Sequence, residues 1–484
     1  MKQKIYPCEL NFHVHSFFDP VGRLFWWNGQ LYRGIRADWT PFFRRLFQDG
    51  IVQKLVEQEL LIDTKLTDLT IDEYEMVVHH PTLPFLSYPH EWCAAMFKDA
   101  ALTTIELAIE LAKHGLTLTD PHPWNLLFDA YKPIFVDFSA IDDSKDSVWI
   151  AYDRFCQFYF YPLILMSHGQ DLAARLIIYE GEGVLKQNIL GLDPTLASAV
   201  SRYKLSLASC LEALLRRKLP SVYLKSVNKI LGTISFFSQS IIVPEHNNNF
   251  IDNRKQKSNL KFLENVKRET ENVCLTSTNK IRLEQNERVN SSLANQENWS
   301  AKQKNIYRIL TELRPTSVLD VGCSTGFYSK LAALAGSQVV AFDLDPVRIT
   351  QLYHDARSQK LSILPLIMDF TKPTPSRGPC SHWSLAASER FQCDLVLALK
   401  LVHHLVRDIY FEQIVEGLAS FSKRWLIVEF IPLEDPEVAN KWWASRMASW
   451  YKLDNFIHAL EKKFRSVSPL PFHPNSRILL LCEK

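Results

Sequence analysis

Apolar and polar positions follow a regular alternation in the second part of the chain. Short apolar runs such as SVLDVG, QVVAFD, LSILPLIMD and RWLIVEFI are separated by stretches that predict helices at 326–335, 346–358 and 408–421. Apolar strands that alternate with helices are typical of a parallel sheet covered on both faces. We therefore predict an α/β domain over residues 299–484, whose last runs, FRSVSPLPF and SRILLLCEK, form an antiparallel pair.

The first part of the chain has a different pattern. The run GRLFWWNGQLYRGI predicts a β-hairpin with Asn28 and Gly29 in its turn, and EWCAAMFKDAALTTIELAIELAKHG predicts a long helix ending at Gly115. The run FCQFYFYPLILM is shorter than the roughly 20 residues that a membrane span needs, so we expect a buried helix there. A small strand-rich lobe followed by a helical lobe predicts an α+β domain over residues 1–243.

Composition changes sharply between these two parts. Residues 244–298 are rich in asparagine and charged residues and contain no glycine. Such a segment can bury little apolar surface, so we predict a polar, Asn-rich linker, with a surface helix around Leu260–Thr270.

Length and charge limit the class of protein. A chain of 484 residues is too long for one hydrophobic core. The net charge of +2, from 55 basic and 53 acidic residues, gives no electrostatic reason to expect a nucleic-acid partner. The nine cysteines form no CxxC pair, which argues against a disulfide framework or a structural zinc site, and we assign no metal. We expect a cytoplasmic protein without a membrane span.

Candidate chemistry lies where the predicted strands of the second part end. In VLDVGCSTGFYS an apolar strand ends at Asp320, and Gly322 and Gly326 occupy the turn before a helix. The next two strands end at Asp343 and Asp369. Ligands of doubly wound sheets bind beyond the carboxyl ends of the strands, where one acidic side chain can accept both ribose hydroxyls of a nucleoside and another can reach an adenine amino group. A dinucleotide dehydrogenase would instead need G-x-G-x-x-G.

This combination resembles the class I S-adenosylmethionine-dependent methyltransferases over about residues 299–484. The resemblance implies a Rossmann-like, mostly parallel sheet of seven strands with a reversed terminal hairpin, and S-adenosyl-L-methionine as the cofactor. Ser324 stands where the family has its middle loop glycine. The positions that match the family's cofactor contacts are Asp320, Gly322, Cys323, Ser324 and Gly326 at the methionine end, Asp343 and Leu344 at the ribose, and Asp369 and Phe370 at the adenine.

Catalytic candidates follow the fourth predicted strand, CDLVLALKLV, and the fifth, RWLIVEFI. His403 and His404 are either general bases or packing residues at a helix start, and Glu429 is a third candidate. No [DN]PP[YF] tetrad, which amide and exocyclic-amine methyltransferases use, follows the fourth strand, and this argues against adenine-N6 or glutamine as the acceptor. The aromatic segment 432–456 either lines an acceptor pocket or packs as a helix face, and the loop 378–391 is a candidate lid.

A second motif lies in the first part of the chain. TDPHPWN and IFVDFSAI place Asp120, Asn125 and Asp137 in the order of a kinase-like catalytic loop followed by a metal-binding aspartate. The resemblance implies a nucleotide and metal site for Mg-ATP. However, no glycine-rich phosphate loop or VAIK-type lysine is present, and the nearest strand cation is Arg33. We therefore expect a degenerate kinase-like domain.

The two-part arrangement also resembles bacterial methyltransferase-like proteins related to nodulation host-specificity proteins. The shared signature is matched by Asp120, Pro123, Asn125, Pro133, Phe135 and Asp137. We therefore expect a methyltransferase that acts on an oxygen of a small-molecule or saccharide-type acceptor, which the first domain presents or recognises. A kinase-like phosphotransferase and a non-catalytic scaffold are the alternatives.

Overall fold

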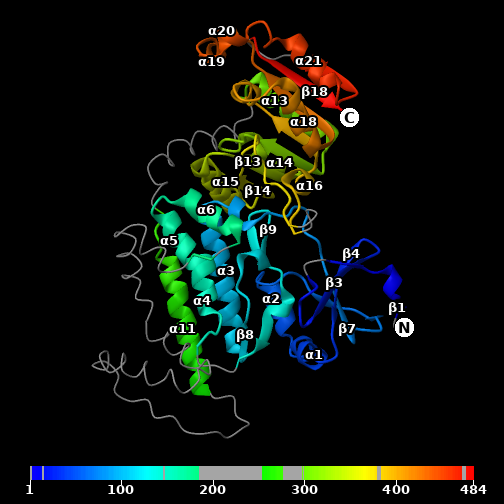
Figure 1. The fold of residues 1–484 in the computed structure, drawn as a ribbon, viewed down its shortest axis with the longest axis vertical. Helices are drawn as coiled ribbons and strands as arrows, with labels where there is room; N and C mark the ends of the chain where they lie inside the picture. Colours follow the sequence, from blue (N-terminus) through cyan, green and yellow to red (C-terminus); the bar gives the residue numbers. More distant parts are fainter. Residues whose placement is uncertain are drawn as a thin grey trace, which may run out of the picture.

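The computed structural model describes residues 3–13, 16–144, 148–181, 183–184, 253–275, 297, 299–378, 383–470 and 476–484. Within these ranges the chain forms two domains that lie one above the other, the first below the second in Figure 1. None of the helices in these ranges is both long and apolar enough to cross a bilayer.

The C-terminal domain is built on a seven-stranded sheet of order β14-β13-β12-β15-β16-β18-β17. All neighbouring strands are parallel except β18, which runs antiparallel to both β16 and β17, so the predicted terminal pair is confirmed. Every residue of β12 and β14 is buried, because helices cover both faces of the sheet. The strands are β12 (Ser317–Val321), β13 (Gln338–Asp343), β14 (Ile363–Ile367), β15 (Cys393–Ala398), β16 (Ser422–Phe430), β17 (Ser466–Pro469) and β18 (Ile478–Glu483).

Helices at the positions predicted as 326–335, 346–358 and 408–421 connect these strands, and further helices precede and follow them. A capping box at Ser300 begins the first of them, where the Ser300 hydroxyl accepts from the Gln303 amide and the Gln303 side chain accepts from the Ser300 amide. The helices are α13 (Ala301–Leu313), α14 (Phe327–Leu334), α15 (Pro346–Gln359), α16 (Ala387–Arg390), α17 (Val402–Leu405), α18 (Phe411–Phe421), α19 (Pro436–Ala439), α20 (Ala444–Met447) and α21 (Leu453–Glu461).

The N-terminal domain begins with an antiparallel sheet of order β2-β3-β4-β7-β5. The predicted hairpin is confirmed, since Trp27 pairs with Gln30 and both turn residues, Asn28 and Gly29, have positive φ. The sheet strands are β2 (Asn11–Phe12), β3 (Gly22–Trp27), β4 (Gln30–Ile35), β5 (Lys65–Leu66) and β7 (Met76–His80), joined by α1 (Thr40–Gln48) and α2 (Ile51–Glu57), while β1 (Gln3–Lys4) pairs with β6 (Leu69–Thr70).

A helical lobe follows this sheet. The predicted long helix is α3, and the apolar run FCQFYFYPLILM is helical and largely buried, as expected. The lobe contains the helices α3 (Ala94–Lys113), α4 (Tyr152–Phe155), the π-helical turn η6 (Cys156–Phe160), α5 (Tyr161–Ser167) and α6 (Asp171–Glu180), with short strand pairs of β8 (Leu116–Leu118) with β11 (Ile141–Asp143) and of β9 (Leu126–Asp129) with β10 (Lys132–Phe135).

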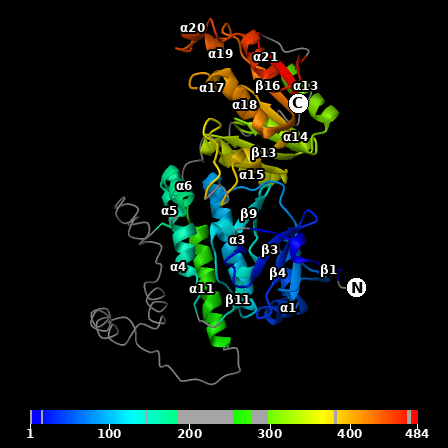
Figure 2. The ribbon, with the colours of Figure 1, turned by 45° about the vertical axis from the view of Figure 1, so that its right-hand side comes forward.

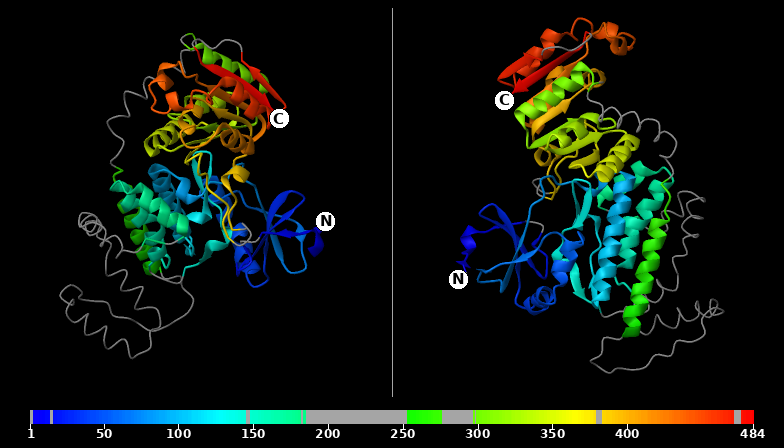
Figure 3. Two further views of the ribbon diagram at one scale, coloured as in Figure 1. Left: turned by 45° about the horizontal axis from the view of Figure 1, so that its top comes forward. Right: turned by 180° about the vertical axis from the view of Figure 1, so that it is seen from behind.

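Part of the segment predicted as a linker is a helix, α11 (Asn253–Glu271). Figures 2 and 3 show α11 running alongside α3, and its Leu263 and Val266 are buried. The Gln256 side chain donates to the Ala112 carbonyl at 3.0 Å, and Lys98 donates to the Val273 carbonyl at 3.0 Å. The predicted surface helix is therefore present and longer than expected: one apolar face packs against the N-terminal domain, while residues such as Lys257 and Glu264 are exposed.

Candidate functional site

The turn after β12 has the backbone shape that the sequence predicted. Gly322 and Gly326 have φ of 70° and 74°, and Ser324 has φ of 53°. A Cβ at Gly326 would lie 2.3 Å from Leu352 Cδ1, so this position needs glycine for space as well as for its backbone angle. Ser324 adopts the left-handed conformation itself, which explains how a serine replaces the middle glycine of the family pattern.

Asp343, at the end of β13, joins this turn to the next one. Its Oδ2 accepts from the Ser324 amide at 2.9 Å, and its Oδ1 accepts from the Asp345 amide at 3.0 Å. Each carboxylate oxygen keeps lone pairs for a further donor. Leu344 beside it is 63% exposed, so an apolar surface is offered next to the carboxylate. The arrangement suits a ligand that carries hydroxyl donors next to an apolar ring.

Asp320 lies beneath the turn. It is 3% exposed, and its Oδ2 accepts from the Ser329 hydroxyl at 2.6 Å. Burial raises the pKa of Asp320 to about 6, although the hydrogen bond from Ser329 acts in the opposite direction. Burial also raises the pKa of the Cys323 thiol. The Asp320 carboxylate therefore joins the end of β12 to Ser329 of α14, beneath the turn.

Asp369 completes the row of acidic residues at the carboxyl edge. Asp343 pairs with Ile367 in the β13–β14 register, which places Asp369 just beyond the neighbouring strand end. Its Oδ1 accepts from the amide and hydroxyl of Thr371 at 2.8 and 2.7 Å. The adjacent Phe370 is 9% exposed. The structure thus brings the predicted cofactor residues to one edge of the sheet.

The two histidines lie just beyond β15. His403 is 1% exposed, whereas His404 is exposed, and their ring centroids are 4.0 Å apart. Burial and the neighbouring His404 lower the pKa of His403 to about 4. Burial and Lys441 also lower the pKa of His404. Both imidazoles are therefore uncharged at neutral pH.

Glu429 lies at the end of β16 and is 1% exposed. It forms a buried ion pair with Lys302 of α13 and accepts from the Lys400 amide at 2.9 Å. Sequence reasoning missed Lys302, since nothing in the local pattern of α13 distinguishes it from a surface lysine. Its partner lies more than a hundred positions away in the chain, and only the fold brings the two charges together.

The aromatic segment 432–456 packs mainly against the domain itself. Trp443 and Tyr451 are buried, and the Tyr451 hydroxyl donates to the Ile431 carbonyl at 2.7 Å. Trp450 stacks on Phe411 with ring centroids 4.2 Å apart. Of the two interpretations that the sequence left open, the packed helix face describes these three aromatic residues.

The loop 378–391 contacts the N-terminal domain. Residues 379–382 lie outside the described ranges, but α16 at its end places Arg390 against Glu91 of the short helix Pro89–Glu91, and both side chains are buried. The Arg390 guanidinium also lies over the Tyr88 ring, 3.9 Å from its centroid. The described part of the candidate lid is therefore held at the boundary between the domains, near α16 in Figure 1.

The kinase-like motif residues of the N-terminal domain also lie close together. The Asn125 side chain donates to Asp120 Oδ2 at 3.0 Å, and Arg154 donates to Asp120 Oδ1 at 2.7 Å. Asp137 Oδ1 accepts from the Ser139 hydroxyl at 2.6 Å and from Arg33 at 3.1 Å. Arginines thus neutralise both carboxylates.

Arg33, which the sequence analysis named only as the nearest strand cation, pairs with the motif residue Asp137. It lies on β4, is 4% exposed and forms a second ion pair with Asp19. A guanidinium in this position holds the strand-rich lobe against the motif of the helical lobe.

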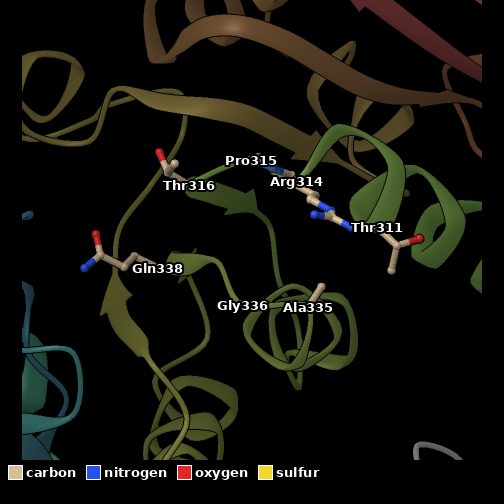
Figure 4. Close-up of a pocket in the computed structure, with 7 residues that line it drawn as sticks. All are labelled: Thr311, Arg314, Pro315, Thr316, Ala335, Gly336 and Gln338. Atoms are coloured by element: carbon tan, nitrogen blue, oxygen red, sulfur yellow. The ribbon is translucent and has the colours of Figure 1, made fainter.

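A shallow hollow of about 720 Å³ lies elsewhere, as Figure 4 shows. Its lining comes from the end of α13, the start of β12 and the turn before β13, including Arg314, Thr316 and Gln338. These are the amino ends of parallel strands, opposite to the edge where such sheets bind ligands, so this hollow is separate from the candidate site.

A sheet of this order, with a glycine turn and acidic residues at three neighbouring strand ends, is the architecture of class I S-adenosylmethionine-dependent methyltransferases. Residues 319–419 match the family model described as "Methyltransferase domain". The chain is therefore an enzyme, an S-adenosylmethionine-dependent methyltransferase.

A relative matches almost the entire chain. The nodulation protein NoeA of Rhizobium meliloti (strain 1021) is 26% identical over 486 residues, which cover 97% of this chain and 95% of that protein. The similarity therefore includes the N-terminal domain as well as the methyltransferase domain.

Two solved structures show weaker similarity. A co-crystal structure of WbdD with the kinase inhibitor LY294002 has 18% identity and a TM-score of 0.29, and the match covers 41% of this chain and only 40% of that one. Magnesium protoporphyrin IX methyltransferase (ChlM) from Synechocystis PCC 6803 with bound SAM has 16% identity and a TM-score of 0.26, covering 38% of this chain and 79% of that one. At these TM-scores neither structure adds to the assignment.

Proposed function

We propose that the enzyme transfers the methyl group to an oxygen of a small-molecule or saccharide-type acceptor in the cytosol, and that the N-terminal domain presents or recognises this acceptor. The assignment of the cofactor site is supported mainly by Asp343. Its carboxylate bridges the turns after β12 and β13 and keeps lone pairs for ribose hydroxyls. Asp369 and Phe370 would receive the adenine, and the turn from Gly322 to Gly326 the methionine end.

Transfer from a sulfonium needs an in-line approach of the acceptor, so positioning supplies most of the rate. The uncharged imidazoles of His403 and His404 lie beyond β15, where an acceptor hydroxyl would approach. His404 is the exposed one, and we propose it as the group that receives the hydroxyl proton. Glu429, in its ion pair with Lys302, would position this side of the site.

The test is a calorimetric titration of S-adenosylhomocysteine into the full-length protein, the Asp343→Ala variant and an Asp408→Ala control. Hydrogen bonds to a charged group contribute about 1.5–3 kcal/mol each, so loss of two should weaken binding about 100-fold or more. Asp408 is an exposed residue of the same domain that pairs with Arg407, and its variant should bind like the wild type. Unchanged affinity in Asp343→Ala would refute the assignment of the ribose site.

A second assay tests whether the acceptor atom is an oxygen. It compares methyl transfer from labelled S-adenosylmethionine to hydroxylated acceptors and to amine acceptors. Product formed only with amines would overturn the acceptor class while leaving the cofactor site in place.

A further inference from the structure

Three potential metal-ligating side chains meet beyond the ends of β15 and β16. His403 and His404 come from α17, and Glu437 comes from α19. One ligand atom from each lies within 4.8 Å of those from the other two. Glu437 is more than thirty positions after the histidines, on a different helix, so no local spacing in the sequence joins it to them.

His403 is the unusual member of this cluster. Its side chain is fully buried, and neither ring nitrogen has a hydrogen-bond partner among the described residues. An unsatisfied buried polar group of this kind is costly and calls for a partner. Glu437 Oε1 lies 3.6 Å from His403 Nε2, which is beyond hydrogen-bond distance.

The two oxygens of Glu437 have different surroundings. Oε2 accepts from Arg477 at 2.7 Å and lies 3.2 Å from the Lys400 ammonium. Oε1 faces His403 instead. Outer partners that hold one carboxylate oxygen and leave the other directed at a histidine are typical of the surroundings of metal ligands.

We propose that His403, His404 and Glu437 bind a divalent transition-metal ion of the zinc type. Two imidazoles and one carboxylate are ligands that Zn²⁺ and its neighbours accept, and three protein ligands leave a coordination position open. Ligand atoms around one ion at about 2.1 Å can be at most about 4.2 Å apart, so small side-chain rotations complete the site.

Nearby charges act in both directions. Lys400, Lys441 and Arg477 oppose a cation. Asp435 offsets part of this, because both of its carboxylate oxygens accept hydrogen bonds from Arg477. The neutral imidazoles add no charge, so an ion would be retained mainly by its direct ligands.

The consequence of such an ion rests on the proposed function and replaces its proton step, because a metal-bound His404 cannot also receive the hydroxyl proton. An acceptor hydroxyl bound at the open position would lose its proton to solvent more readily. Its oxygen would then form the bond to the methyl carbon while the carbon–sulfur bond breaks, and the electron pair would return to sulfur in S-adenosylhomocysteine.

The test uses the full-length protein after treatment with a chelator. Titration with Zn²⁺ should show one bound equivalent, and Co²⁺ should give visible absorption without a thiolate charge-transfer band. We expect His404→Ala and Glu437→Gln each to weaken binding at least about tenfold. His458→Ala, which removes an exposed histidine on α21, should bind like the wild type.

Two results would overturn the proposal. One is the absence of metal binding by protein that still binds S-adenosylhomocysteine, which would leave a bare histidine–carboxylate contact. The other is one equivalent of metal that neither variant weakens, or a thiolate band, which would place the ion on cysteines. Loss of S-adenosylhomocysteine binding by the wild type would instead refute the proposed function, so the two failures are distinguishable.

Discussion

Glu91→Gln should destabilise the contact between the two domains. The Glu91 carboxylate accepts from Arg390 Nη1 at 3.0 Å and Nη2 at 2.5 Å, from the Thr374 hydroxyl at 2.7 Å and from the Tyr88 amide at 2.8 Å. Burial by itself would raise the pKa of Glu91, but the Arg390 guanidinium outweighs it and holds the pKa below its ordinary value. The carboxylate is therefore ionised and fully bonded.

The magnitude follows from burial of both partners. The side chains of Arg390 and Glu91 are 0% and 1% exposed. Removing one charge of a buried pair typically costs about 3–5 kcal/mol, because the other charge stays buried without compensation. Glutamine keeps the shape and some hydrogen bonds, so we expect a loss near the lower end, about 3 kcal/mol. The loop that begins after Asp369 should also become less ordered, which would weaken binding of S-adenosylhomocysteine.

Equilibrium urea unfolding followed by tryptophan fluorescence, together with calorimetric titration of S-adenosylhomocysteine, measures both effects. The double variant Glu91→Gln/Arg390→Met removes the orphaned guanidinium and should recover a substantial part of the lost stability. Lys65→Gln, which breaks an exposed pair with Asp63, should cost less than about 1 kcal/mol. A Glu91→Gln variant as stable as the wild type, or a double variant no better than the single one, would refute the reasoning.

Three further predictions concern separate parts of the molecule. Gly326→Ala places a Cβ 2.3 Å from Leu352 and should lower both the melting temperature and the cofactor affinity. Gly336→Ala, the control, is also at positive φ but meets no atom within 4 Å, so it should lower the melting temperature less. Burial, with a nearby arginine charge, lowers the pKa of His80 to about 3, so the unfolded chain, with its histidine near 6.5, takes up the proton first on acidification. The contribution of the neutral His80 to the free energy of unfolding should be present above pH 6.5, and it should fall by about 2 kcal/mol between pH 7 and pH 5. His80→Gln should lack this part of the decline. Equal pH slopes of the two proteins in urea unfolding would contradict the prediction. Because an arginine pairs with Asp137, we expect no Mg-ATP binding by calorimetry, and binding that Asp137→Ala abolishes would favour the phosphotransferase alternative.

Local pattern predicted much of the architecture. Alternating apolar runs predicted the parallel sheet, the glycine turn predicted the bend after β12, and Asn28-Gly29 predicted the hairpin. These features depend on neighbours in the chain, since strand period and turn conformation are set by a few consecutive residues. The acidic strand ends were predictable for the same reason, because parallel strands present their carboxyl ends at one edge of a sheet.

Tertiary structure alone decided the contacts between distant segments. The sequence contained Glu91 and Arg390, Arg33 and Asp137, and the residues of α11, but it gave no sign that each would meet its partner. The same holds for Glu437 beside His403. A charged residue in a single sequence looks the same whether it ends in solvent or in a buried pair. Whether the side chain is exposed or buried in an ion pair depends on which surfaces the packed domains remove from water, and that is a property of the whole fold.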